Sequence, residues 1–210
     1  MIVGFGSAPP QLLERLRLYV DDPRVLIYPE FFDAKRELIE KRYARYVEKV
    51  LAYRHRIVIA LWPDYCHAEC AARFGLHSMT DIVWVFPLHH MWEINFVLGF
   101  MDRVFDTFFV GYASQQSLRD YTIHQFIDAC RAHGLPMWYL GANSREIYEA
   151  VLNRFDGVDV TTLSIPGWSY RDNLRPEAPK VISEWLRALA NGVVLRSRNG
   201  RLVAARRLDS

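Results

Sequence analysis

Short apolar runs alternate along the chain with longer stretches in which apolar residues recur every three or four positions. The runs are rich in Val, Ile, Phe, Trp and Tyr and lack strict alternation, as parallel strands covered on both faces do. The longer stretches place their apolar side chains on one stripe, which is typical of amphipathic helices. The seven runs are 2–5, 25–28, 57–62, 82–86, 107–112, 137–140 and 158–163. The pattern therefore predicts strands and helices in alternation.

Seven βα units can be counted before Pro176. Parallel strands with right-handed crossovers either close into a barrel or form an open doubly wound sheet. We favour an α/β fold with a TIM-barrel-like parallel barrel, complete or incomplete. One helical stripe joins Ile39, Tyr43, Tyr46, Val47, Val50 and Leu51. We expect a single domain over 1–210, with the βα units in 1–175 and a C-terminal part in 176–210.

The C-terminal part combines an amphipathic stretch with a turn signal. Residues 177–191 have the helical period, and Asn199-Gly200 stands between two β-prone runs. Asn-Gly flanked by such runs is a strong signal for a β-hairpin. From Arg187 to Arg207 the chain has six Arg and no acidic residue. We therefore expect a C-terminal helix followed by a basic hairpin.

Composition narrows the class of protein further. The chain has 210 residues, 51% of them hydrophobic and 14% aromatic, with a formal net charge of +2. This is enough apolar surface for a well-buried core. Three Cys residues do not make a disulfide framework, and residues 1–7 have no basic or apolar leader pattern. We expect a cytoplasmic protein with no membrane partner, because charged residues interrupt every long apolar window.

Ligands of parallel α/β folds bind at the carboxyl ends of the strands, so the residues after each run are the first candidates for a site. A cavity lined by aromatic and Gly residues with one or two carboxylates suits a flat heterocycle of nucleobase size, because rings stack and carboxylates accept paired N–H groups. The same residue types also form ordinary turns, and that alternative stays open. The predicted rim comprises Glu30, Asp64, His67, His89 and Trp168.

An ordered series of motifs covers residues 57–171. It consists of Leu-Trp-Pro-Asp-Tyr-Cys at 61–66, Phe-Pro-Leu at 86–88, Val-Gly-Tyr-Ala-Ser at 110–114, Gly-Leu-Pro-Met-Trp-Tyr-Leu-Gly at 134–141, Gly-Val-Asp at 157–159 and Trp-Ser-Tyr-Arg at 168–171. In order and spacing the series resembles the queuine/archaeosine tRNA-guanine transglycosylase superfamily. The resemblance is closest to the shorter branch that puts 7-deazaguanine bases into DNA.

The resemblance implies a transferase that exchanges a base in DNA or tRNA without a cofactor. Asp64 matches an aspartate that reads the guanine-like edge, and Gly111 matches a Gly whose backbone closes over the base. Asp159 lies where the family's late strand begins, near the catalytic aspartate that attacks the ribose anomeric carbon. Asp159 and Asp64 are thus the catalytic candidates. The expected base-binding set is Trp62, Asp64, His89, Gly111, Gly141 and Trp168.

Two features depart from the family. In the tRNA enzymes the nucleophile lies three residues beyond the Gly-[Ile/Val]-Asp element, where this chain has Thr162. A hydroxyl is a poor nucleophile toward an oxocarbenium-like centre, so Asp159 or Asp64 must supply the carboxylate if exchange occurs. Nothing like the family's structural zinc set follows Asp159. Cys66, His67 and Cys70 lack an evident fourth ligand, and we expect no metal.

Arginines supply the candidate contacts to phosphate, because a guanidinium binds phosphate oxygens in bidentate fashion. The candidates are Arg171, Arg196, Arg198 and Arg201. A charged hairpin can equally be a solvated edge that opposes aggregation. Two other functions stay open: a non-catalytic barrel that binds nucleic acid, and a small hydrolase that uses His67, His89 and either Glu30 or Asp64. The oligomeric state is open too.

Overall fold

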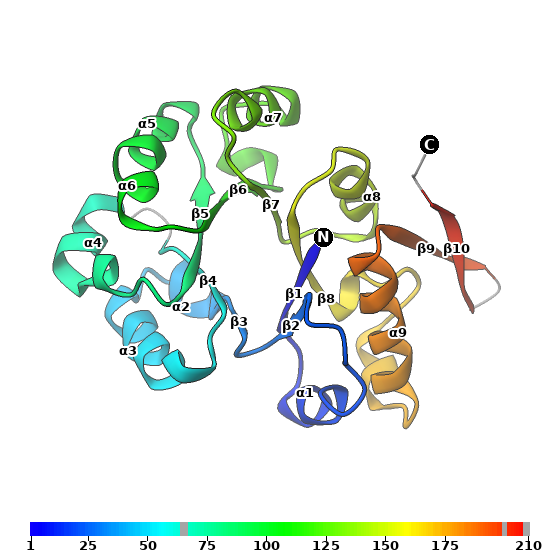
Figure 1. Ribbon diagram of the computed structural model, residues 1–210. Coiled ribbons are helices and arrows are strands. Elements are labelled where there is room, and N and C mark those ends of the chain that lie inside the picture. The colour runs from blue at the N-terminus through cyan, green and yellow to red at the C-terminus, as the bar shows by residue number, and fades with distance from the viewer. Residues whose placement is uncertain (64–66, 199–200, 208–210) are drawn as a thin grey trace. The chain divides into compact units, whose positions relative to one another are not determined.

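The computed structural model describes residues 1–63, 67–198 and 201–207, with the side chains of residues 7, 67–70 and 195 onward outside the description. Eight parallel strands follow the order β2-β1-β8-β7-β6-β5-β4-β3 (Figure 1). In this order every strand except the pair β2 and β3 lies beside its neighbours in the chain, and β8 lies beside β1, as in a nearly closed (β/α) barrel. The predicted α/β, TIM-barrel-like class is therefore confirmed. The strands are β1 (Ile2–Ser7), β2 (Val25–Ile27), β3 (Phe31–Phe32), β4 (Ile59–Leu61), β5 (Val83–Leu88), β6 (Phe108–Ala113), β7 (Met137–Leu140) and β8 (Gly157–Thr161).

The strands β2 and β3 stand at the two ends of this order and are joined by residues 28–30 alone. Parallel neighbours need a crossover of about a dozen residues, and residues 28–30, which form a turn and a bend, are too few for one, so β2 and β3 are not a hydrogen-bonded pair. The predicted run 25–28 covers β2. The next strand, β3, pairs with β4 through Phe31 and Ile59, and it lies beyond the predicted run.

The chain divides into two compact units. Unit 1 consists of Met1–Tyr28 and Tyr139–Ser210, and unit 2 consists of Pro29–Trp138. The division falls inside β7, which gives its first two residues to unit 2 and its last two to unit 1. The single domain expected over 1–210 stays a prediction.

Unit 1 is built on β1, which pairs in parallel with β2 on one side and β8 on the other. Its register places Gly4 opposite Asp159. Alternating Val and Phe residues of β1 and β8 are fully buried, and so is the apolar face of the last helix, around Trp185 and Leu186. The helices of unit 1 are α1 (Pro10–Leu16), α8 (Ser144–Leu152) and α9 (Ala178–Ala190). The predicted C-terminal helix is thus confirmed as α9.

The predicted hairpin is also present. The strands β9 (Val193–Arg198) and β10 (Arg201–Arg207) pair in antiparallel fashion as a separate two-stranded sheet. Their register places Arg198 opposite Arg201 and Arg196 opposite Val203. The turn residues Asn199 and Gly200 lie outside the described residues.

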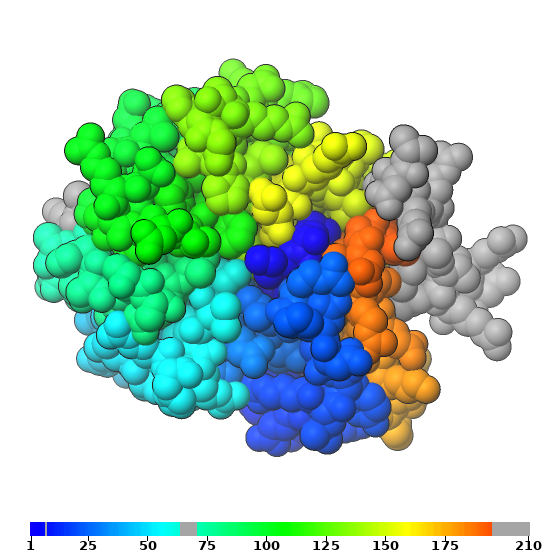
Figure 2. Space-filling view, in the orientation of Figure 1, coloured from blue at the N-terminus to red at the C-terminus, as the bar shows by residue number. Residues whose placement is uncertain are grey.

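Unit 2 has an aromatic core on and around its strands. Phe31 and Trp138 stack with ring centroids 5.3 Å apart, and Phe109 meets the same indole edge-on at 5.2 Å. Such pairs add a directional contribution to the burial of the rings. The helices of unit 2 are α2 (Lys35–Ile39), α3 (Tyr43–Tyr53), α4 (His67–Phe74), α5 (Ile94–Phe96), α6 (Asp102–Val104) and α7 (Ile123–Ala132). Of these, α3 and α4 are neighbours on the face shown in Figure 2.

One helical segment of unit 2 changes its hydrogen-bonding pattern in the middle. Between α5 and α6, the five residues of η4 (Val97–Met101) form a π-helical turn. Phe96 and Phe100 stack across this turn at 5.1 Å. The segment carries the apolar window seen in the sequence, yet among the helices of the described residues none is long and apolar enough to cross a membrane.

Candidate functional site

Two of the predicted site residues are in contact in unit 1: Gly141, which directly follows β7, and Asp159, the middle residue of β8. Gly141 N–H donates to Asp159 Oδ2 at 2.9 Å, and Ala142 N–H donates to the Asp159 carbonyl oxygen at 3.0 Å. Gly141 has a φ of 63°. This left-handed conformation, which Gly adopts without steric cost, turns its amide toward the carboxylate. With only 9% of Asp159 exposed, the carboxylate has a fixed orientation.

A second interaction holds the same turn. Ser164 Oγ donates to the Ala142 carbonyl oxygen at 2.7 Å and accepts from Thr161 N–H at 3.0 Å. Ser164 ends η6 (Thr162–Ser164), the 3₁₀ turn that follows β8 directly. The loops after β7 and β8 are therefore tied together through Asp159 and Ser164, which preorganises this strand end.

Trp168 and Thr162 belong to one hydrogen-bonded chain. Trp168 Nε1 donates to Asn173 Oδ1 at 2.8 Å, and Asn173 Nδ2 donates to Thr162 Oγ1 at 3.4 Å. Thr162 is only 2% exposed, so its hydroxyl serves the packing of the loop. Arg171 is exposed on η7 (Tyr170–Leu174) in the same loop. In the described part of unit 1, the carboxylate near the expected nucleophile position is thus that of Asp159.

His89 is held from both its backbone and its ring at the end of β5 in unit 2. Its N–H donates to Glu93 Oε2 at 2.6 Å, and its carbonyl oxygen accepts from Asp120 N–H at 3.2 Å. Its Nδ1 lies 2.9 Å from the Leu118 carbonyl oxygen. Because a carbonyl can only accept, Nδ1 carries the proton. His89 is buried, so these contacts give it a structural role at the strand end.

The neighbouring His90 has a different environment, as expected for adjacent residues. It is exposed, its Nδ1 lies 3.0 Å from Asp120 Oδ2, and its ring stacks on Trp92 at 6.0 Å. The interaction with His90 lowers the pKa of Asp120, with the Met91 amide adding to the effect. The segment that carries both histidines is therefore held by Glu93 and Asp120.

The sequence analysis missed a buried acid, Asp33, at the carboxyl end of β3. Its side chain is almost fully enclosed, and this burial raises the pKa of Asp33 from 3.8 to about 6, although Lys35 and backbone amides act in the opposite direction. A buried carboxyl with such a pKa can give or take a proton near neutral pH. Asp33 directly follows the apolar pair Phe31–Phe32, so its position after a short strand could have marked it as a candidate site residue.

Trp62 does not fit the stacking role expected for it. The side chain is fully buried, and its ring packs edge-on against Trp84, Phe100 and Phe105 with centroids 5.3 to 6.1 Å away. A ring enclosed in this way contributes to the core. Its buried Nε1 has no hydrogen-bond partner in the described part of the chain.

The structure describes some of the remaining candidates and not others. Gly111 is buried within β6, opposite Pro87 of β5. Asp64 lies outside the described residues, and so do the side chains of His67, Arg196, Arg198 and Arg201. Among the residues with described side chains, no three His, Cys, Asp or Glu form a group that could hold a metal ion. Cys66 and Cys70 fall outside that search.

Glu93 is a further residue whose role the sequence analysis missed. Its Oε2 accepts from both His89 N–H and His90 N–H, and it closes a capping box at the start of η3 (Met91–Glu93). An acid three residues after a cap position is the usual signature of this motif. Here the cap residue is His90, which is not a common cap type. The spacing of three residues between His90 and Glu93 was therefore the sequence feature that could have predicted the capping box.

The fold and the site define an α/β protein of the TIM-barrel-like class with a buried carboxylate, that of Asp159, within β8. No protein-family model matches the chain. It is 28% identical over 179 residues to "Uncharacterized protein ORF192" of Acidianus two-tailed virus, which covers 84% of this chain and 86% of that protein. A solved structure of thiamine phosphate pyrophosphorylase from Bacteroides thetaiotaomicron aligns with a TM-score of 0.42 and 16% identity, over 90% of this chain and 95% of that one.

Proposed function

We propose that this protein binds a guanine or 7-deazaguanine base at the carboxyl ends of its strands and exchanges that base in DNA or tRNA. The observation that carries the proposal is the contact between Gly141 N–H and the carboxylate of Asp159. The order of the strand-end motifs supports it, because it resembles the transglycosylase superfamily. A cytoplasmic location, without a membrane partner, is part of the proposal.

The contact suits a carboxylate that must be presented in one direction. A buried carboxylate loses hydration and needs hydrogen bonds in return. The Gly141 amide supplies one such bond without placing a side chain beside the acid. A preformed acceptor of this kind can face either the N–H edge of a guanine-like base or the anomeric carbon of its sugar. Trp168, half-buried and anchored through Asn173, is the aromatic side chain of this unit that we assign to the base plane.

For exchange, a carboxylate oxygen of Asp159 forms a bond to the anomeric carbon while the glycosidic C–N bond breaks. The leaving base takes up a proton, and a glycosyl ester remains on the aspartate. The incoming base then attacks the same carbon through its glycosidic nitrogen, loses the proton of that nitrogen and frees the carboxylate. Charge and protons balance over the two steps, and no cofactor enters. A carboxylate suits the oxocarbenium-like character of both steps.

Calorimetric titration with guanine and 7-cyano-7-deazaguanine tests the binding. Asp159→Asn keeps an oxygen that can accept from Gly141 and removes the charged nucleophile, so the fold and base binding should be retained while the exchange step is lost. Asp128→Asn, an exposed acid on α7, is the matched control and should bind as the parent does. If neither base binds the parent protein, the proposal is wrong.

Transfer of labelled guanine into DNA or tRNA tests the exchange step separately. The buried hydroxyl of Thr162 at the expected nucleophile position favours a second candidate, a barrel that binds nucleic acid without catalysis. Under that candidate the parent retains nucleic acid but transfers no label. Under the exchange proposal the label is incorporated, and Asp159→Asn stops the incorporation.

A further inference from the structure

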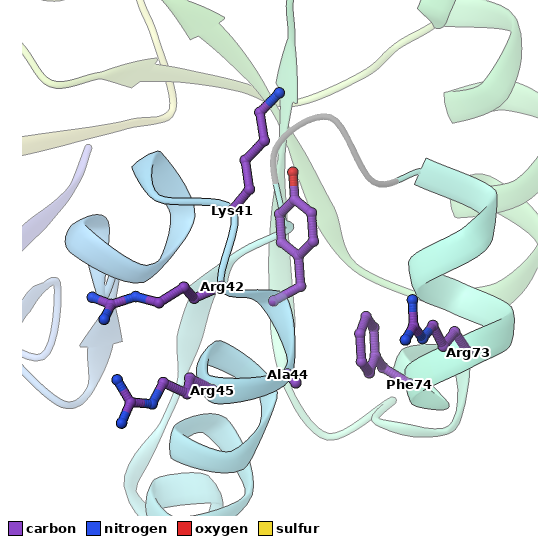
Figure 3. A pocket seen from close by; sticks show the side chains of 7 residues that line it. Lys41, Arg42, Ala44, Arg45, Arg73 and Phe74 are labelled. Atoms are coloured by element: carbon purple, nitrogen blue, oxygen red, sulfur yellow. The ribbon is translucent and has the colours of Figure 1, made fainter.

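A cavity of about 360 Å³ opens on unit 2 beside the start of α3 and the end of α4 (Figure 3). Its lining combines four cationic side chains with two aromatic ones. The lining residues are Lys41, Arg42, Tyr43, Ala44, Arg45, Arg73 and Phe74. These seven include no acidic residue, so the cavity carries a concentrated positive charge and fits an anionic ligand.

The backbone adds to this charge. Tyr43 begins α3, and Arg42 stands at the cap position without a side-chain cap. The first turn of α3 also contains no acid. The positive end of an 11-residue helix therefore faces the same region as the cations. Lys41, just before it, has a φ of 52°, and strained residues of this kind are often found at ligand sites.

One lining residue, Arg42, already forms an ion pair with Glu40. Arg42 contacts Glu40 Oε2 at 2.8 Å through its terminal nitrogen. Its Nε is nevertheless buried with no hydrogen-bond partner in the part of the chain that the structure describes. A buried guanidinium N–H without an acceptor is costly.

The directions of the cationic side chains indicate the kind of anion. In Figure 3, Arg42 and Arg45 extend together to one side of α3, Lys41 extends away from them, and Arg73 projects from the facing helix α4. A single compact phosphate cannot contact heads that diverge in this way. A chain of phosphates, spaced along a backbone, can meet them one after another.

We infer that this cavity and its cations bind the phosphate backbone of a single-stranded nucleic acid. The Arg73 guanidinium carbon lies over the Phe74 ring, 5.5 Å from its centroid, so an aromatic side chain supports one of the cations. That the polyanion is a nucleic acid rests on the proposed function, whereas the phosphate chemistry rests on the cavity alone. The site differs from the Asp159 site, which belongs to unit 1.

Binding of a fluorescent oligothymidylate, measured by anisotropy over a range of NaCl concentrations, tests the inference. The double variant Arg45→Gln/Arg73→Gln removes two exposed cations of the cavity. At about 0.1 M salt it should bind roughly tenfold or more weakly, and the slope of log affinity against log salt should fall by roughly 1.4, about 0.7 for each lost contact. Arg56→Gln/Arg103→Gln removes two exposed arginines of unit 2 elsewhere, and it should change neither value.

Oligothymidylate contains no guanine, so its binding is independent of the free-base titration. Loss of oligothymidylate binding with retained base binding supports the cavity, even where the exchange proposal fails. Equal affinity and slope for the two double variants would overturn the inference. Thymidine monophosphate and inorganic phosphate serve as competitors. If either displaces the oligonucleotide at an equal concentration of phosphate groups, the ligand is a single phosphate and the backbone assignment is wrong.

Discussion

Replacing Glu93 by Ala should lower the free energy of unfolding by about 3 kcal/mol. Its Oε2 accepts from His89 N–H at 2.6 Å and from His90 N–H at 2.9 Å. Hydrogen bonds to an ionised group contribute about 1.5 to 3 kcal/mol each. We take the lower value for both, because His90 is exposed and water can replace part of its bond. The cost of burying the carboxylate, which is only 2% exposed, is a second reason for using the lower value of each bond.

Thermal unfolding followed by circular dichroism measures this effect. For a protein of this size, about 1 kcal/mol corresponds to roughly 2 to 4 °C, so Glu93→Ala should lower the Tm by roughly 6 to 12 °C. Glu93→Gln keeps one oxygen acceptor and should cost about 1 kcal/mol. Glu48→Ala, at an exposed position of α3, controls for the loss of an acid. If Glu93→Ala and Glu48→Ala melt at the same temperature, the two amide contacts do not stabilise the fold.

Three further predictions concern the strand ends. Burial raises the pKa of Asp33 from 3.8 to about 6, because the folded protein favours the neutral carboxyl. The free energy of unfolding is therefore highest below about pH 4 and falls as the pH rises through 6. Asp33→Asn should therefore match the parent at pH 4 and exceed its unfolding free energy by about 2 to 3 kcal/mol at pH 7; equal stability at both pH values would contradict the assignment. Gly141→Ala should cost about 1 to 2 kcal/mol, because a side chain is strained at its φ of 63°, whereas Gly99→Ala, where a Cβ meets nothing within 4 Å, should cost nothing measurable by denaturant titration. Trp62→Phe should leave base affinity in calorimetry unchanged and Trp168→Phe should weaken it; the opposite order would restore the stacking role to Trp62.

Much of the fold could be predicted because most strands are short, continuous apolar runs followed by turn residues. The pairing of β3 could not, since two residues are too few to show a period. The helical stripe from Ile39 to Leu51 was predicted as continuous, yet it is broken between α2 and α3. Lys41 adopts a positive φ at the break, and Ile39 is 70% exposed. A local change of backbone conformation therefore overrode the periodicity of the side chains.

Candidate site residues were predictable where position after a strand was enough. The sequence placed Gly141 after one strand and Asp159 near the start of the next, and the two residues are in contact. Trp62 also follows a strand, but its side chain turns into the core. The direction of a side chain at a strand end depends on the register and on neighbouring elements, which the sequence does not reveal. The basic cavity was missed because Arg73 lies 28 residues beyond Arg45 and meets it only through the packing of α3 on α4.

The π-helical turn Val97–Met101 has a consequence for the comparison of relatives. A turn of this kind holds one residue more than the α-helical turn it replaces, and such turns are rare. A relative with a continuous α-helix here would be one residue shorter, with α5 and α6 otherwise alike. A single-residue gap within 97–101 would then separate two well-matched segments in an alignment. The position of such a gap would indicate which relatives share the stacked pair of Phe96 and Phe100.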